Sequence, residues 1–142
     1  MAIATPEARF IRSINKLLPS DIYTEGMANP YRGGTPDRYY EGSRGFLWVE
    51  YKYTKDVPAS WRISDHITSL QKRWIRRAQK NNIPIAVIAG FNKKGLILVK
   101  DMYWDTVMHR DQIKKYSLDK QSIAAFIIAH CGTKEASLKY EH

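Results

Sequence analysis

The run WVEYKY, which begins at Trp48, constrains the fold more than any other part of the chain. Its aromatic and β-branched residues favour a strand, and residues two apart in a strand point to the same face of a sheet. Trp48, Glu50 and Lys52 are therefore expected to form one row. The loop GSRG before this run joins it to an earlier strand, so the sequence predicts a hairpin of strands at 36–41 and 46–53.

An aspartate at the start of this hairpin is expected to face the same row. Asp37 follows Thr-Pro, and its carboxylate is placed to meet that of Glu50 across the strand pair. Two carboxylates held close together raise each other's pKa unless a cation lies between them. Mg²⁺ takes one or two protein carboxylates and keeps its other positions for water and phosphate.

Lys52 beside such a pair can position an attacking water and offset the charge of a phosphate in transition. Together, two acids and a lysine predict a site that hydrolyses phosphodiester bonds. Each fragment alone has an ordinary alternative: Glu50 and Lys52 as a solvated ion pair, and Pro36-Asp37 as part of a turn.

Helical spacing of apolar residues predicts three helices. Thr5 can cap the first, with Pro6 at its first position and apolar residues recurring up to Leu18. Ser64 can cap the second, which is expected to run to Asn81. The segment SIAAFIIAH, 122–130, favours a buried third helix. The apolar stripe predicted for the second helix consists of Ile67, Leu70, Trp74 and Ala78.

Two more strands, 85–89 and 96–99, follow the second helix, and the irregular segment 20–35 has room for one short strand. The order α-β-β-(β)-α-β-β-α predicts an α/β protein with a mixed β-sheet flanked by helices. A length of 142 residues, without a linker or an internal repeat, predicts one domain over 1–142.

The net charge of +9 lies mostly in the second part of the chain. Residues 1–60 hold eight Lys and Arg against seven Asp and Glu, whereas residues 61–142 hold fifteen against seven. Such a basic surface indicates a nucleic-acid partner, with an anionic membrane or solubility alone as alternatives. The single cysteine, Cys131, excludes a disulfide framework and is expected to be a buried, inert thiol. Without a membrane span or signal sequence, the expected location is cytoplasmic.

The sequence TPD, followed thirteen residues after its aspartate by EYK, resembles the signature of the PD-(D/E)XK nuclease superfamily. The wider pattern GTPDRYYEG…WVEYK…SLQKRW is similar to the VRR-NUC branch of that superfamily. The resemblance implies a restriction-endonuclease-like core, metal binding by the aspartate and the acid of the E-x-K, and a lysine that assists hydrolysis. It also implies an acid on the first helix in the metal shell and a glutamine on the second helix beside the site.

By this resemblance, the catalytic residues are Asp37, Glu50, Lys52 and Gln71. The implied metal ligands are Glu7, Asp37, Glu50 and the backbone carbonyl of Tyr51. Mg²⁺ is the expected cofactor, and Mn²⁺ is expected to substitute for it. For Glu7 the alternative is a simple helix-dipole effect, and for Gln71 a position that only flanks the core.

The second helix also carries a concentration of basic residues with no acid among them. Like charges three and four residues apart destabilise a helix, so their grouping favours contact with a phosphate backbone over solvation alone. The predicted DNA-binding residues are Lys72, Arg73, Arg76, Arg77 and Lys80.

These features predict a metal-dependent endodeoxyribonuclease that selects junctions, flaps or other branched DNA. The alternatives are a homing-type, site-specific double-strand endonuclease and a catalytically inactive nucleic-acid-binding module. A homodimer or larger homo-oligomer is expected, because one site per chain cuts one strand per encounter. Its candidate interfaces are 21–32 and 123–128, and for 123–128 packing into the core under the sheet is the alternative. The resemblance is to stand-alone enzymes of phages and mobile elements.

Overall fold

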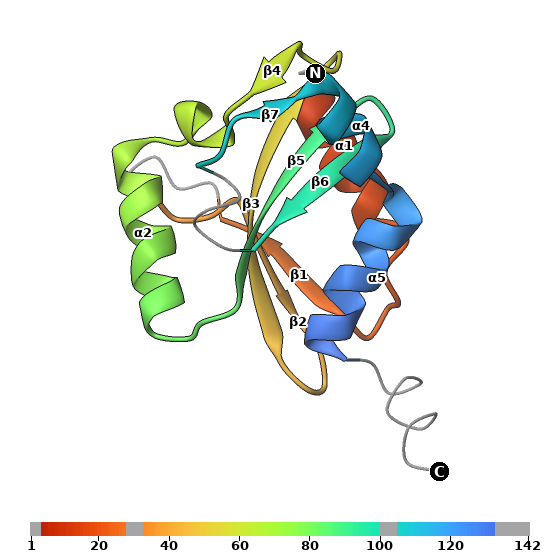
Figure 1. The fold of residues 1–142 in the computed structure, drawn as a ribbon. Helices are drawn as coiled ribbons and strands as arrows, with labels where there is room; N and C mark the ends of the chain where they lie inside the picture. The colour runs from red at the N-terminus through yellow and green to blue at the C-terminus, as the bar shows by residue number, and fades with distance from the viewer. Residues whose placement is uncertain (1–3, 28–32, 100–104, 133–142) are drawn as a thin grey trace.

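The computed structural model describes residues 4–27, 33–99 and 105–132 (Figure 1). Strands β1 to β3 follow the first helix, α2 separates them from β5 and β6, and α5 comes last. This order confirms the expected α/β class. The helices and strands are α1 (Pro6–Asn15), β1 (Tyr23–Gly26), β2 (Arg38–Glu41), β3 (Phe46–Thr54), β4 (Ser60–Trp61), the 3₁₀ helix η1 (Ile63–His66), α2 (Ser69–Lys80), β5 (Ile85–Phe91), β6 (Lys94–Leu98), β7 (Met108–His109), α4 (Arg110–Tyr116), β8 (Leu118–Asp119) and α5 (Lys120–Cys131).

The main sheet is mixed and has six strands in the order β1-β2-β3-β5-β6-β8. The pairing of β3 with β5 is parallel, with α2 as the crossover, and the other pairings are antiparallel. A small second sheet pairs β4 with β7. Seven consecutive register pairs between β3 and β5, from Trp48↔Ile85 to Thr54↔Phe91, make β3 a central strand.

Helices cover both faces of this sheet. Figure 1 shows α2 on one side and α1 and α5 on the other. The cluster under α1 and α5 includes Phe10, Ile14 and Tyr51, while the cluster under α2 and α4 includes Ile75 and Ile113. The alternation of β3 thus divides the chain into two cores, since neighbouring residues of the strand belong to opposite faces.

The N-terminus of α1 confirms the predicted cap. Thr5 accepts a hydrogen bond from the amide of Ala8 at 3.1 Å, and Pro6 occupies the first turn. The predicted start of the second helix at Ser64 is wrong, because Ser64 lies in η1 and donates to the Asp105 carboxylate at 2.7 Å. Thr68 caps α2 instead.

The predicted apolar stripe of the second helix is wrong in part. Ile67 is buried but precedes α2, and Leu70 is 50% exposed. The buried residues of α2 are Ile75 and Ala78. The helix is therefore turned so that the side containing Gln71 and Trp74, rather than Leu70, meets the sheet.

For the segment 123–128, which the sequence leaves open between interface and core, the structure decides for core. Ile123, Ala124 and Ile127 are buried within their own chain, against α1 and the sheet. The other predicted interface, 21–32, includes residues 28–32, which lie outside the described part. Cys131 is buried and free, as expected, and burial raises the pKa of its thiol to about 11. Across the described ranges, no helix combines the length and apolar character that crossing a membrane requires.

Candidate active site

The central strand β3 carries the row that the sequence predicts. Trp48, Glu50 and Lys52 pair with Ile85, Val87 and Ala89 of β5, and all three β5 residues belong to the core on the α2 side. Glu50 is 1% exposed in this setting, whereas the Lys52 side chain is 21% exposed. An acid therefore projects into an apolar layer, with a partly accessible lysine beside it.

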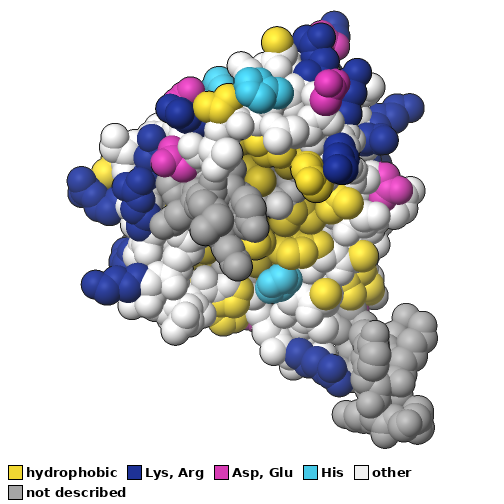
Figure 2. Space-filling view, in the orientation of Figure 1, with side chains coloured by type: hydrophobic (Ala, Val, Ile, Leu, Met, Phe, Trp, Pro, Cys, Tyr) yellow, Lys and Arg dark blue, Asp and Glu magenta, His cyan; other side chains and the backbone are white. Residues whose placement is uncertain are grey.

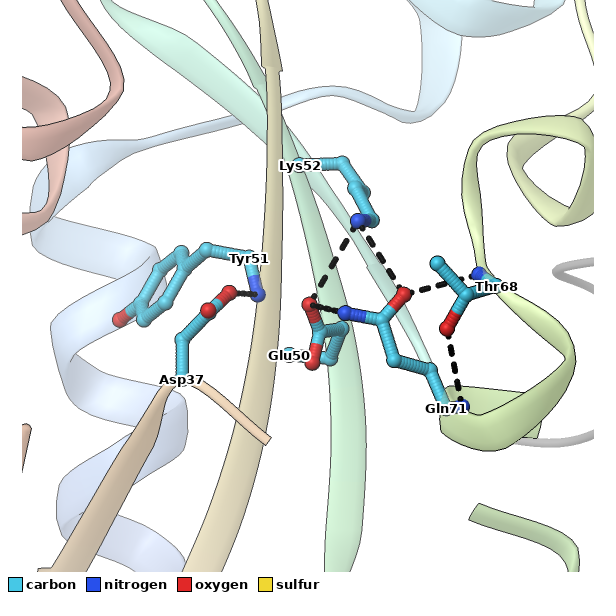
Figure 3. A network of polar contacts seen from close by, with 6 residues as sticks. All are labelled: Asp37, Glu50, Tyr51, Lys52, Thr68 and Gln71. Carbon is cyan, nitrogen blue, oxygen red and sulfur yellow. Dashed lines mark hydrogen bonds and ion pairs between the residues drawn. The ribbon is translucent and has the colours of Figure 1, made fainter. Parts of the chain in front are cut away.

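Asp37 reaches this row from the position just before β2. The β2–β3 ladder ends at Arg38↔Val49, which places Asp37 next in register opposite Glu50. The Asp37 Oδ2 accepts a hydrogen bond from the Tyr51 amide at 2.8 Å (Figure 3). The predicted meeting of Asp37 with the Glu50–Lys52 row is present in the structure.

The chain before Asp37 passes close to the first turn of α2. Gly34 has a φ of 100°, and a Cβ at this position would lie 2.6 Å from the Leu70 carbonyl oxygen. Only glycine fits both the conformation and the space. This contact fixes the segment that leads to Asp37 against the helix that carries Gln71.

Gln71 connects α2 to both charged residues of β3. Its Nε2 donates to Glu50 Oε1 at 3.1 Å, and its Oε1 accepts from the Thr68 amide at 2.9 Å and from Lys52 Nζ at 3.5 Å (Figure 3). The Thr68 hydroxyl accepts in turn from the Gln71 amide at 3.1 Å, which completes a capping box. The Gln71 side chain thus caps the N-terminus of α2 and also contacts the acid and the lysine.

Aromatic packing holds α2 in this position. The Trp48 ring lies 5.1 Å from the Trp74 ring and 4.9 Å from the Tyr39 ring, measured between centroids. The guanidinium of Arg77 lies 5.1 Å from the centroid of the Trp74 ring. The row Trp48, Glu50, Lys52 shows the specific role of these aromatics, since its first member anchors the helix that contacts the other two.

The electrostatics of Glu50 are unusual for a glutamate. Burial first, and the nearby Asp37 carboxylate second, raise its pKa to about 9, although Lys52 acts in the opposite direction. Lys52 Nζ lies 3.6 Å from Glu50 Oε1. The second oxygen, Oε2, is buried and has no hydrogen-bond partner among the described residues. A buried carboxylate oxygen without a donor is an available ligand for a cation.

Glu7 lies at the start of α1, on the other side of the site. Burial, and second the charge of Asp37, raise the pKa of Glu7, while the charge of Lys52 lowers it. Glu7 is therefore close enough to interact electrostatically with both residues. Glu7 and Lys52 line one cavity of about 400 Å³ together with Trp61 and His66. The structure therefore brings Glu7 to the rim of the group formed by Asp37, Glu50 and Lys52.

The donor set suits a hard divalent cation. In the described ranges, no three Asp, Glu, His or Cys side chains converge closely enough to form a complete metal cage. Mg²⁺, however, needs only one or two protein carboxylates, and Asp37 with the unpartnered Oε2 of Glu50 supplies them. The residues present fit such an ion.

The basic residues of α2 lie on its outer side. Arg73, Arg76, Arg77 and Lys80 are exposed, and Lys72 is half-buried. Ser69, Lys72, Arg73 and Arg76 line a hollow of about 300 Å³. Since Gln71 is on the same helix, this basic surface and the site share one rigid element.

The chain matches no family model and no curated protein. Among solved structures, a Holliday junction resolvase from the archaeal hyperthermophile Archaeoglobus fulgidus is similar, with a TM-score of 0.51 and 13% sequence identity. The similarity covers 85% of this chain and 97% of that one. The two chains share a restriction-endonuclease-like fold. This confirms the predicted fold class, while the assignment to the VRR-NUC branch stays a prediction.

Proposed function

We propose that the chain is a metal-dependent endonuclease that hydrolyses phosphodiester bonds in branched DNA. The observation that carries the proposal is the cluster of Asp37, Glu50, Lys52 and Gln71 on the resolvase-like sheet. A buried acid with an unpartnered oxygen, beside a second acid and a lysine, has a clear use in binding a cation. A purely structural ion pair explains neither the burial of Glu50 nor the position of Asp37.

Asp37 and Glu50 are the proposed metal ligands, with the Tyr51 carbonyl as a third. The Tyr51 amide already points to Asp37, and in an extended strand the carbonyl of a residue points to the same side as its amide. Glu7, at the rim of the cavity, binds the cation directly or through water. A bound Mg²⁺, or Mn²⁺ in its place, would supply Lewis acidity to the phosphate and lower the pKa of a bound water.

Lys52 has the accessibility that Glu50 lacks. Its side chain lines the cavity, and its ammonium group lies between Glu50 and Gln71. From there it orients an attacking water and offsets negative charge on the phosphate. Gln71 positions Lys52 and Glu50 relative to one another, since its amide contacts both.

The similar solved protein is a junction resolvase, and this supports branched DNA as the substrate class. The exposed basic residues of α2 bind the DNA backbone without reading its sequence, as phosphate contacts do. Resolving a junction requires two cuts, and each chain has one such site among its described residues. A homodimer is therefore the proposed working unit.

A cleavage panel tests this proposal. Linear, nicked, flap and four-way junction DNA are incubated with the protein in Mg²⁺, Mn²⁺ or EDTA. We expect cleavage of the branched substrates with either metal and none in EDTA. Asp37→Ala and Glu50→Ala should abolish cleavage, while Asp111→Ala, which removes an exposed aspartate of α4, should not.

Each other outcome selects a different function. Cleavage that persists in Asp37→Ala or Glu50→Ala refutes the site. Sequence-specific cutting of linear DNA favours the homing-type alternative. Binding of DNA by the wild-type protein, with no cleavage of any substrate in either metal, favours the inactive binding module.

A further inference from the structure

A second group of basic residues surrounds a cavity away from α2. The cavity measures about 520 Å³ and lies where the ends of β3, β5 and β6 meet α4. Its polar lining is strongly basic, and its floor includes Val57 and the buried ring of Phe91. The charged residues that line it are Lys55, Asp56, Lys93, Lys94 and Lys114.

Four lysines and one aspartate give this lining a net charge of +3 at neutral pH. Among the described residues, none of the four lysines forms an ion pair. Asp119 lies near Lys94, but its carboxylate caps α5 by accepting from the Ser122 amide at 2.8 Å. Like charges gathered in a concave site repel one another, and an anion in the cavity removes that repulsion.

The lysine-lined cavity is next to the candidate active site. Residues 52–54 line the cavity that contains Glu7, and residues 55–57 line this one. Lys55 follows Lys52 by three residues, which corresponds to about 10 Å along an extended chain. A nucleic-acid strand places phosphates only a few ångströms apart, so one strand can reach both cavities.

The position differs from that of the basic helix. Figure 2 shows Lys and Arg side chains gathered on the left, where α2 lies, and again at the upper right, around α4. The two groups come from separate elements, since Lys93 belongs to the β5–β6 turn, Lys94 begins β6 and Lys114 belongs to α4. A substrate held by both groups has contacts on two sides of the molecule.

We infer that the cavity lined by Lys55, Lys93, Lys94 and Lys114 binds backbone phosphates of the nucleic-acid substrate, at a second site distinct from α2. The inference rests on the proposed function and extends it. Lysine suits this task because its ammonium group is a point charge that contacts phosphate without the paired geometry of arginine. Such contacts increase the affinity for nucleic acid without adding a sequence preference.

Paired double variants test the site. Lys55→Ala with Lys114→Ala removes two lysines of the cavity, and Lys16→Ala with Lys115→Ala removes two exposed lysines that do not line it. Both variants lower the net charge by the same amount. Lys115 is a close control for Lys114, since it is the next residue of α4 and its Nζ lies 5.5 Å from the Tyr116 ring instead.

Binding to a labelled four-way junction is measured by fluorescence anisotropy in EDTA over a series of salt concentrations. We expect the cavity variant to bind about 10-fold more weakly and to lose about 1 to 2 units of the log–log salt slope, as two phosphate contacts would. The control should change the slope by much less. Circular dichroism is used to check that both variants are folded.

The outcomes separate this inference from the function on which it rests. If the two double variants lose affinity and slope equally, the cavity is not a site and only the overall charge matters. If the cavity variant binds like the wild type, the second site is refuted while the nuclease proposal stands. If the wild-type protein binds no junction or duplex DNA, both proposals fall.

Discussion

The substitution Glu50→Gln tests the electrostatics of the site in metal-free protein. Glu50 is 1% exposed, and its pKa is raised from 4.5 to about 9. Between these values the folded protein keeps a proton that the unfolded chain has already lost. The contribution of the protonated Glu50 to the free energy of unfolding is therefore fully present below about pH 4.5 and is lost as the pH rises toward 9.

In this pH window, where only the folded protein holds the proton, the free energy of unfolding falls by about 1.4 kcal/mol for each unit that the pH rises. From pH 5 to pH 8, the wild-type protein should lose about 4 kcal/mol from this group. Glutamine has nearly the same shape as the protonated acid but does not titrate. The stability of Glu50→Gln relative to wild type should accordingly increase by about 4 kcal/mol over the same interval.

Urea unfolding in EDTA at several pH values between 5 and 8 measures this difference. Asp111→Asn removes an exposed acid of α4, and its stability should change with pH as that of the wild type does. Added Mg²⁺ should flatten the wild-type curve, because a bound cation takes the place of the proton, and should have little effect on Glu50→Gln. Parallel stability curves for wild type and Glu50→Gln would refute the raised pKa and, with it, the physical argument for a cation.

Further predictions concern catalysis, binding and assembly. Lys52→Ala should lower the single-turnover rate with little change in DNA affinity. The double variant Arg73→Ala with Arg76→Ala should instead weaken DNA binding and reduce its salt dependence. The proposed role of Lys52 in hydrolysis is wrong if Lys52→Ala leaves the single-turnover rate unchanged. Gln71→Leu and Gln112→Leu each remove a side-chain oxygen that accepts from the N-cap amide of a helix, and each should cost at least about 1 kcal/mol in thermal unfolding. Only Gln71→Leu should lower turnover, because Gln71 also contacts Glu50 and Lys52; equal turnover in the two variants would leave Gln71 a helix cap. Sedimentation at micromolar concentration should show a species heavier than 16.5 kDa, and a monomer that persists with DNA present would exclude the dimer.

Much of the fold could be predicted because local and global signals agree. The Thr-Pro start of α1 and the alternation of β3 have strong local preferences, and both are present in the structure. The start of α2 was missed because Ser64 and Thr68 are both good caps. The distinguishing signal was available: Thr68 has a glutamine three residues later, which forms a capping box, and Ser64 does not.

Other parts had no such signal. Strands β4, β7 and β8 are two residues long, so they show no periodicity and depend on partners distant in sequence. The apolar segment 123–128 could equally be core or interface from its composition, and only contact with α1 and the sheet decides for core. The unpartnered oxygen of Glu50 is likewise a tertiary property, since the sequence gives a residue's type but not its burial.

The orientation of α2 explains how one helix contributes to both the candidate site and the proposed DNA-binding surface. Packing of Trp74 on Trp48 presses one side of the helix against β3 and turns Gln71 toward Glu50 and Lys52. The same rotation leaves the basic residues on the outer side. If Arg73 binds a phosphate as proposed, a single helix fixes that phosphate relative to Glu50. Contacts of α2 with the DNA backbone would then also position the bond to be cut, and their loss should misplace the substrate as well as release it.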